Sequence, residues 1–399
     1  MSASTISPDA LRATIAAHLP ALVALRHELH QHPEIRFEEE WTAARIARFL
    51  DEVGIPYTTG HAKGTGIVAT LEGGSGKTVA LRSDMDALEI EEETGLPYAS
   101  TIPGRMHACG HDGHMANLCG AVKTLWEHRD AVNGRVKFVF QPAEENGAGG
   151  KYMVEEGILD DVDAAFGLHG WPTLATGKVG VKAGEAMASA DFFRITIRGA
   201  GTHAADPGSG VDPVVAAGHI LTALQNIVSR EINPWDPAVI TVATIRAGHI
   251  TNVIPETATM EGTFRALSHR VRNQIFEAIP RIADHTASAH RADAVTEFTG
   301  EPYPVLFNDP TMSELAKEVI VESFGRDMLD EPRHPTMGAE DFAFFLEKVP
   351  GAYVWLGVNS KEGERHPPLH SPLFDFNDEA LPHGIEVMCR LALRYLQTA

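Results

Sequence analysis

A nine-residue segment, Met106–His114, gathers one thiol and three imidazoles. Cys109 and His111 stand two residues apart, so an extended chain points both side chains the same way, toward one metal ion. Two adjacent acids, Glu144 and Glu145, follow further along the chain. Repulsion between neighbouring carboxylates disfavours such a pair unless a cation neutralises it. These residues indicate a catalytic metal site, in which one carboxylate binds metal and the other moves protons.

The alternative is a polar loop around a structural zinc ion. Structural zinc sites usually close with four Cys or His ligands in paired spacings, and the chain has only three cysteines. Two of them, Cys119 and Cys389, lie in apolar helical patterns and are most simply buried core thiols. We therefore favour the catalytic site. So sparse and odd-numbered a set of cysteines also suits a reducing compartment better than a disulfide scaffold.

At 399 residues the chain exceeds the size at which one hydrophobic core keeps growing, so we expect two domains. Acidic residues outnumber basic ones by 54 to 33, and the resulting net charge of −21 repels nucleic acid and anionic membranes. No run approaches the roughly 18 apolar residues of a membrane span, and no signal-like segment opens the chain. We expect a cytoplasmic protein without nucleic-acid or membrane partners.

Helical and β-rich patterns alternate through the first part of the chain. The helical patterns cover Pro8–His32, Glu38–Val53 and Gly113–His128. The β-rich runs are Gly66–Leu71, Thr78–Arg82, Arg135–Phe140 and Ala164–Leu168. Strands that alternate with helices predict an α/β fold with a mainly parallel central sheet. The segments 311–324, 353–357 and 377–396 read as a helix, a strand and a helix that return to this domain.

The residues that carry chemistry follow three of these β-rich runs. Asp84 and Asp86 come after the second run, Glu144 and Glu145 after the third, and His169 after the fourth. In open α/β sheets, ligands bind outside the carboxyl ends of the strands. The sequence therefore predicts that these side chains share one site.

The rhythm changes from about residue 188. The elements there read as strand Phe192–Arg198, helix Pro213–Arg230, strands Ala238–Arg246 and Ala258–Arg265, helix Arg270–Ala289 and strand Ala294–Phe298. The order strand, helix, strand, strand, helix, strand is that of the ferredoxin-like unit. We therefore expect a ferredoxin-like domain over 188–300, inserted into a discontinuous metal-binding domain made of 1–187 and 301–399.

Several further residues are candidates for supporting roles. Asp86 is suited to fixing the tautomer of a metal-bound imidazole, although either Asp84 or Asp86 would also serve as a helix N-cap. His169 and His370 have loop-forming neighbours, and their case as ligands rests on the need to complete two metal spheres. His30, His32 and His107 have two open interpretations, helix-end polarity or support of the ligands.

The chain resembles the dinuclear metallo-aminoacylase and carboxypeptidase G family. Within it, the similarity is to the branch of hippurate hydrolases, N-acyl-amino-acid amidohydrolases and plant auxin-conjugate hydrolases. The matching motifs occur in order along nearly the whole chain: His30–Glu34, Asp84–Leu88, His107–His114, Gln141–Glu145, Gly167–His169, Thr202–Ala205 with Val211–Pro213, Asn252–Pro255, Met337–Asp341 and Leu369–Pro372. The chain departs from the branch at Pro207–Ser209, where a further His often follows the Pro.

Carried over residue by residue, the resemblance implies five metal ligands, namely Cys109, His111, Glu145, His169 and His370. It implies two divalent metal ions per subunit. Zinc and manganese are the first expectation, and cobalt or nickel are also compatible with these ligand types. Glu144 is implied as the catalytic base.

The resemblance also implies a lid domain that dimerises and delivers His203 toward the active site of a neighbouring subunit. We therefore expect a homodimer or a dimer-based oligomer. Asn252 and Arg265 match lid positions that are suited to holding the carboxylate of a small substrate.

The expected activity is hydrolysis of an N-acyl amino acid, hippurate-like or N-acetylated, to a carboxylic acid and a free amino acid. Glu144 would move the proton, and His203 would help to hold the oxyanion. A dipeptidase or carboxypeptidase with the same metals is the near alternative. A non-catalytic metal-binding or ligand-binding protein is the distant one, and Glu144 argues against it because a pure binder needs no second acid.

Overall fold

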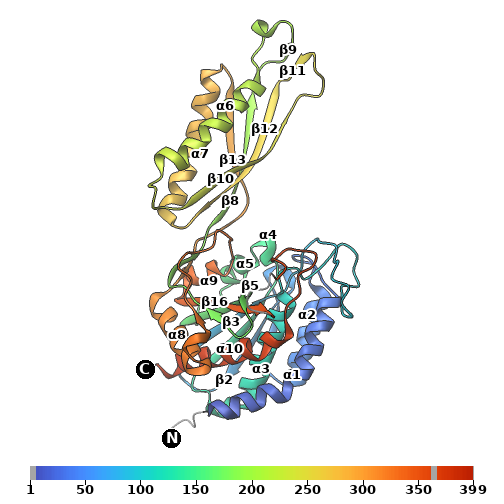
Figure 1. Cartoon of the computed structure of the whole chain (residues 1–399), viewed down its shortest axis with the longest axis vertical. Coiled ribbons are helices and arrows are strands. Elements are labelled where there is room, and N and C mark those ends of the chain that lie inside the picture. The colour runs from blue at the N-terminus through green and yellow to red at the C-terminus, as the bar shows by residue number, and fades with distance from the viewer. Residues whose placement is uncertain (1–5, 361–365, 399) are drawn as a thin grey trace. The chain divides into compact units, whose positions relative to one another are not determined.

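A computed structural model of the chain describes residues 6–360 and 366–398. The chain divides into two compact units (Figure 1). Unit 1 comprises Met1–Gly184, Phe307–His334 and Asp341–Ala399, and unit 2 comprises Glu185–Leu306 and Pro335–Glu340. The segment 335–340 was expected in the metal-binding domain. It groups with unit 2 because its backbone pairs with that of residues 186–188: the Ala188 amide donates to Thr336 O (3.2 Å) and Gly338 O (2.9 Å).

Among the described residues, an eight-stranded sheet in the order β1-β2-β4-β3-β5-β16-β6-β15 forms the centre of unit 1. Its strands are β1 (Tyr57–His61), β2 (Gly66–Glu72), β3 (Thr78–Asp84), β4 (Arg135–Gln141), β5 (Ala164–Ala175), β6 (Val179–Gly180), β15 (Leu329–Asp330) and β16 (Gly351–Asn359). The central neighbours β4, β3, β5 and β16 run parallel. Antiparallel pairs join β1 to β2, β2 to β4 and β16 to β6. The prediction of an α/β fold with a mainly parallel central sheet is confirmed.

The helices of unit 1 pack on this sheet and on one another (Figure 1). They are α1 (Pro8–Gln31), α2 (Glu40–Val53), α3 (His111–Glu127), the short α4 (Glu144–Gly147), α5 (Gly149–Glu155), α8 (Pro310–Phe324), α9 (Ala343–Lys348) and α10 (Leu381–Gln397). α3 and α10 pack against β3, and α1 packs against both of these helices. α5 and α9 pack against each other.

Capping residues set several helix ends. The Ser7 side chain accepts the Ala10 amide at the start of α1, and the Asp309 carboxylate accepts the Thr311 amide at the start of α8. α2 ends at Gly54, whose φ of 81° is the left-handed conformation that glycine adopts without a side-chain clash.

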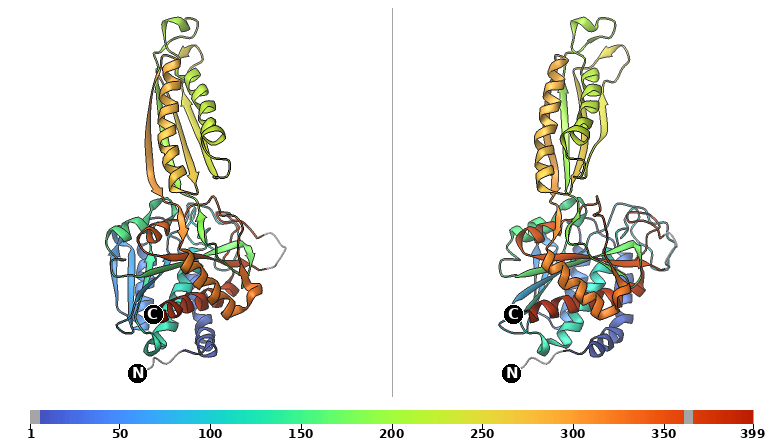
Figure 2. Two further views of the ribbon diagram at one scale, coloured as in Figure 1. Left: turned by 90° about the vertical axis from the view of Figure 1, so that its left-hand side faces the viewer. Right: turned by 60° about the vertical axis from the view of Figure 1, so that its left-hand side comes forward.

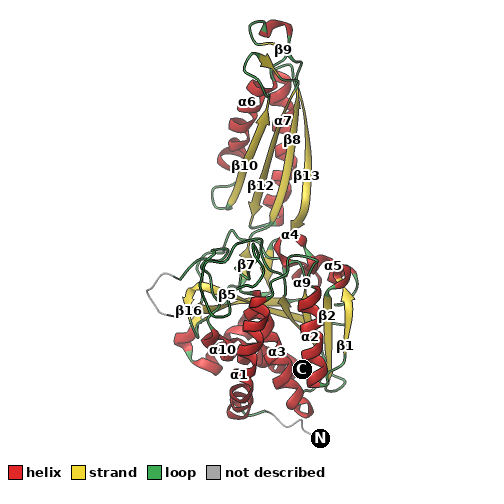
Figure 3. Cartoon of the chain, turned by 90° about the vertical axis from the view of Figure 1, so that its right-hand side faces the viewer, coloured by secondary structure: helices red, strands yellow, loops and turns green. Residues whose placement is uncertain are grey.

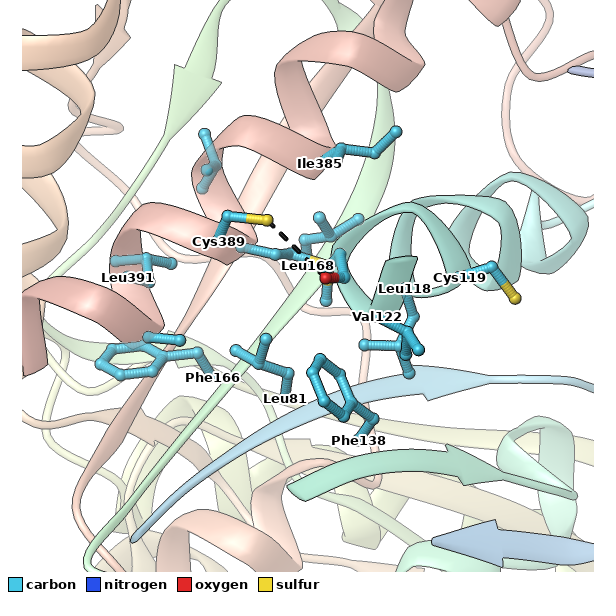
Figure 4. Close-up of a cluster of buried hydrophobic side chains, with 14 of the residues drawn as sticks. Leu81, Leu118, Cys119, Val122, Phe138, Phe166, Leu168, Ile385, Cys389 and Leu391 are labelled. Carbon is cyan, nitrogen blue, oxygen red and sulfur yellow. Dashed lines mark hydrogen bonds between the residues drawn. The ribbon is translucent and has the colours of Figure 1, made fainter. Parts of the chain in front are cut away.

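Apolar side chains from the sheet and from α3 and α10 form the core of unit 1 (Figure 4). Those labelled there are Leu81, Phe138, Phe166 and Leu168 from strands, Leu118 and Val122 from α3, and Ile385 and Leu391 from α10. Cys119 and Cys389 are fully buried in the same core, so the prediction of buried core thiols is confirmed. Burial raises the pKa of both thiols, which keeps them neutral and unreactive.

Unit 2 consists of a four-stranded antiparallel sheet in the order β10-β12-β8-β13, with α6 and α7 packed against it (Figures 2 and 3). Its elements are β8 (Ala190–Arg198), β9 (Thr202–His203), α6 (Pro213–Asn226), β10 (Ala238–Ala247), β11 (Val253–Ile254), β12 (Thr257–Ala266), α7 (His269–Ala289) and β13 (Asp293–Tyr303). β9 and β11 form a separate antiparallel pair. Two further strands, β7 (Gly184–Met187) and β14 (Leu306–Asn308), stand at the sequence boundaries between the units.

Some predicted boundaries were wrong. β5 does not end at Leu168 but continues to Ala175, because it keeps its pairing with β16 through Trp171. His169 therefore lies within the strand instead of after it. The predicted helix over residues 213–230 ends at Asn226 and continues as a π-helical turn, Ile227–Glu231.

None of the helices within the described residues is both long and apolar enough to cross a membrane.

Candidate metal centre

All five predicted metal ligands come together in unit 1. The donor atoms of Cys109, His111 and His169 lie within 4.8 Å of one another, and so do those of Cys109, Glu145 and His370. The Cys109 Sγ lies 3.4 Å from the His169 Nε2. Both groups include Cys109, so the thiol stands between two potential metal positions.

The backbone between the first two ligands requires glycine. Gly110 has a φ of 84°, and a Cβ at that position would lie 3.2 Å from the Phe376 ring and 3.3 Å from the Phe374 ring. A larger residue would be strained and would push the chain away from these rings. The glycine thus lets Cys109 end a loop while His111 opens α3.

Several donor atoms of the cluster are buried without a hydrogen-bond partner among the described residues. They are both ring nitrogens of His111 and the Glu145 Oε1. The His370 Nε2 lies 3.0 Å from that oxygen, but without hydrogen-bond geometry. Leaving a buried polar atom unpaired costs about 1–3 kcal/mol, and coordination to a metal removes that cost. Because thiolate, imidazole and carboxylate together suit divalent transition metals, the residues fit such ions.

The predicted base lies beside this cluster. Ligand atoms of His111, Glu144 and Glu145 fall within 4.8 Å of one another, and the Glu144 side chain is buried. The Asp341 amide lies 3.4 Å from the Glu144 Oε1 and donates to it. The two adjacent acids therefore both point to the same place, and geometry alone does not decide which of them binds metal.

Asp86 makes two kinds of contact. Its Oδ1 lies 3.4 Å from the His111 Nδ1, as expected of a residue that orients an imidazole. Its two oxygens also accept the backbone amides of Glu144 and Glu145, each at 2.9 Å. These amides open α4, so Asp86 also serves a helix start, which was the alternative interpretation.

His114 is a supporting residue to which the sequence analysis gave no separate role. Its Nε2 accepts the Gly170 amide (2.8 Å), so its Nδ1 carries the proton that it donates to Asp84 (2.7 Å). Burial alone would raise the pKa of Asp84, but His111, His114 and Arg82 outweigh it and hold that pKa well below its ordinary value. Both ring nitrogens of His114 are thereby engaged, which assigns it to holding β5 in place beside His169.

A second buried network was also missed. Arg82 donates to Gln141 (2.8 Å), Asp84 (2.8 Å) and Asp341 (2.7 Å). The Gln141 amide donates to the Asp341 carboxylate as well. This network fixes the segment whose backbone amide meets Glu144. The motifs at 141–145 and 337–341 are therefore joined through hydrogen bonds that neither motif reveals alone.

The three histidines with open interpretations differ in their surroundings. His30 is buried and bonds Asp112 (2.8 Å) and Glu92 (3.2 Å). Burial opposes its charge, but Asp112 and Glu92 outweigh burial and raise its pKa to about 9. His32 instead stacks on Trp41 at the end of α1. Both nitrogens of His107 are buried without a hydrogen-bond partner in the described part of the chain.

Two of the predicted substrate contacts lie together in unit 2. His203 in β9 pairs with Val253 in β11, and the Ala204 amide donates to Asn252 O at 3.0 Å. His203 is exposed, and its Nδ1 accepts the Ala205 amide at 3.0 Å. The imidazole proton must therefore sit on Nε2, which leaves His203 as a hydrogen-bond donor.

Arg265 lies elsewhere in unit 2. It stands eight residues beyond Thr257 on β12, a strand length of roughly 26 Å, whereas Asn252 precedes Thr257. The Arg265 guanidinium lies over the Phe192 ring, and burial lowers its pKa. A single chain therefore does not bring Asn252 and Arg265 onto one substrate carboxylate.

The sequence pattern of Peptidase family M20/M25/M40 matches residues 80–394. The chain belongs to this family. N-acetylcysteine deacetylase of Bacillus subtilis (strain 168) is 40% identical over 379 residues, which are 94% of this chain and 97% of that relative. IAA-amino acid hydrolase ILR1-like 5 of Arabidopsis thaliana is 40% identical over 381 residues, 94% of this chain and 86% of that relative.

A solved structure shares the fold over almost the whole chain. It is the YXEP protein of Bacillus subtilis, described as a dinuclear metal binding peptidase from the M20 family. Its TM-score is 0.84 at 37% identity, and the match covers 96% of this chain and 100% of that one. The resemblance drawn from the motifs is therefore confirmed at the level of the family.

Metal binding by this M20 family chain should release protons. In the metal-free site, burial together with Glu145 raises the pKa of the Cys109 thiol. Burial opposes charge on His111, but Asp84 and Asp86 outweigh it and raise its pKa to about 10. Both residues hold a proton at neutral pH and must lose it to bind metal. Affinity should rise with pH below these pKa values, by about a hundredfold per pH unit for two protons.

Calorimetry in buffers of different ionisation enthalpy counts the released protons. We expect the count to fall by about one in Cys109→Ser and to stay unchanged in Cys119→Ala, a matched control because Cys119 is a buried thiol of the core. Equal proton release by the wild type and Cys109→Ser would show that Cys109 is not a ligand.

Proposed function

We propose that this M20 family protein hydrolyses the amide bond of N-acyl amino acids to a carboxylic acid and a free amino acid. The observation that carries the proposal is the position of Glu144, whose carboxylate lies within 4.8 Å of ligand atoms of His111 and Glu145. A protein that only binds metal needs no further buried acid there. The names of two relatives, N-acetylcysteine deacetylase and IAA-amino acid hydrolase, support this substrate class.

Cys109, His111, Glu145, His169 and His370 would hold two divalent ions per subunit. Zinc or manganese is our first assignment, and cobalt and nickel also suit this donor set. When bound, such ions supply Lewis acidity, which polarises an amide carbonyl and lowers the pKa of water. The buried, unpaired ligand atoms of His111 and Glu145 support this assignment, as does the description of the solved relative as dinuclear.

Glu144 is the residue that moves the proton. It accepts a proton from the attacking water and donates it to the amide nitrogen as the carbon–nitrogen bond breaks. Its backbone is held by Asp86, and its Oε1 receives the Asp341 amide. Both contacts keep the carboxylate oriented without occupying all of its acceptor sites. General acid–base catalysis of this kind contributes about 10²–10⁴-fold.

Unit 2 is proposed as a ferredoxin-like lid that dimerises. The strand order β10-β12-β8-β13, all antiparallel, supports the ferredoxin-like assignment. His203 would donate its Nε2–H to the oxyanion in the site of the partner subunit. The distance between Asn252 and Arg265 along unit 2 supports this arrangement, because a carboxylate held by both would need them from different subunits. Arg265 offers a bidentate fork for that carboxylate.

A substrate panel tests the proposed function. Purified metal-loaded protein is assayed for release of free amino acid from N-acetyl and N-benzoyl amino acids and from dipeptides with a free amine. We expect turnover of the N-acyl compounds, with the dipeptides slower by an order of magnitude or more. Turnover confined to dipeptides would instead assign a dipeptidase or carboxypeptidase. A metal-loaded protein inert to the whole panel would favour a binding protein.

A further inference from the structure

Glu39 is a fully buried carboxyl in unit 1 for which the local structure has no need. It immediately precedes α2, but its side chain does not cap that helix. Glu34 does so, by accepting the amides of Trp41 (3.1 Å) and Thr42 (2.8 Å). A buried carboxyl is costly unless its hydrogen bonds repay its desolvation. The question is therefore what Glu39 holds.

Both oxygens of Glu39 are used by residues distant in sequence. The Oε1 accepts the Ala143 amide at 2.9 Å, and the Oε2 accepts the Thr65 hydroxyl at 2.9 Å. Ala143 directly precedes the proposed base. The side chain of Glu39 therefore ties the start of α2 and the beginning of β2's approach to the turn that carries Glu144 and Glu145.

That turn is under backbone strain. Ala143 has φ 56° and ψ 44°, the left-handed region that costs a residue with a Cβ roughly 1–2 kcal/mol. Such a conformation persists where surrounding contacts over-determine it. Here they do: Glu39 binds the Ala143 amide, and Asp86 binds the next two amides, those of Glu144 and Glu145.

We propose that Glu39 is a positioning residue for catalysis, which holds Ala143 in its left-handed conformation and so orients the Glu144 carboxylate. The two acids Glu39 and Asp86 divide the task, since three successive amides leave the turn and a single carboxylate holds only two of them. This inference rests on the proposed function, because it assigns a purpose to the base. It places the third hydrogen bond of the turn on a residue 104 positions earlier in the chain.

The surroundings of Glu39 also indicate how it acts. Burial, followed by the nearby Asp86, raises the pKa of Glu39 to about 8, so the carboxyl is largely neutral at pH 7. What the turn needs from it is then an acceptor oxygen at the correct reach and not a negative charge. Glutamine keeps that reach and a carbonyl acceptor, and its amide can donate to Thr65. Aspartate keeps the acid but is one methylene too short.

Glu39→Gln and Glu39→Asp therefore separate reach from charge. We expect kcat of Glu39→Gln within about threefold of the wild type, and kcat of Glu39→Asp and Glu39→Ala lower by roughly 10–100-fold, the scale of a misplacement of about 1 Å. KM and bound metal should change less than threefold. Glu34→Ala is the matched control, since it removes two hydrogen bonds at the same helix start without touching the turn. It should lower the unfolding midpoint and leave kcat unchanged.

The same assay distinguishes failure of the inference from failure of the proposed function. A wild type that hydrolyses no N-acyl amino acid overturns the function. An active wild type with Glu39→Asp as active as Glu39→Gln, or more so, overturns the positioning role of Glu39. So does a loss in Glu39→Asp that merely follows loss of metal. If Glu39→Ala does not fold, the comparison of Gln with Asp decides alone.

Discussion

Glu144→Gln should lower kcat for an N-acyl amino acid by about 10²–10⁴-fold while the protein keeps its metals. Glutamine preserves the shape of the side chain and can still accept the Asp341 amide, but it cannot take a proton from water. The adjacent Glu145 has the unpaired buried oxygen that suits a ligand, and it lies 3.0 Å from His370. We therefore expect Glu145→Gln to lose metal, which makes it the matched control.

Elemental analysis and kcat are measured on the same samples of both variants. The assignment of the two acids is reversed if Glu144→Gln loses metal and Glu145→Gln retains it. Near-normal turnover by Glu144→Gln with metal bound would remove Glu144 from the reaction altogether.

His203→Ala should lower kcat by about 10²–10³-fold, because an oxyanion donor of this kind contributes about 2.7–4 kcal/mol. Its hydrogen bond from Ala205 fixes the donor proton on Nε2, and its exposed turn has no core to stabilise. His219, an exposed imidazole that stacks on His290 along α6, provides the control. We expect His219→Ala to keep wild-type kcat.

Mixing two inactive variants tests whether His203 acts across subunits. If His203 serves its partner in a twofold dimer, a heterodimer of His203→Ala and Glu144→Ala has one intact site and one doubly defective site. Random exchange makes half of the dimers mixed, so about a quarter of wild-type activity should return. If His203 serves its own chain, every site carries one lesion. Verified exchange without recovery would contradict the cross-subunit assignment and would leave the metal assignment untouched.

The sequence revealed those parts of the site that are carried by local patterns. The spacing of Cys109 and His111 and the adjacency of Glu144 and Glu145 restrict which side chains share a face, and strand ends restrict where they meet. The parallel centre of the sheet followed from strands alternating with helices. These features depend on neighbours in sequence, and they were predictable for that reason.

The supporting contacts depend on pairing between distant segments and left no local signal. Glu39 and Asp86 bind backbone amides, for which residue type carries little information, and the Arg82–Asp341 ion pair spans 259 positions. The strands β6 and β15 have two residues each, too few for any periodicity. The extension of β5 past Leu168 likewise reflects its pairing with β16, which no property of the segment itself announces.

The central claim is that hydrolysis of N-acyl amino acids requires divalent metal at the cluster around Cys109. The most direct measurement is a metal titration of the chelated protein, followed by elemental analysis and by release of free amino acid in the same samples. We predict no turnover in the metal-free protein and activity that rises until about two equivalents of metal are bound per chain, with Cys109→Ser failing to recover at those concentrations. Full turnover in protein that has been stripped of metal would contradict the account.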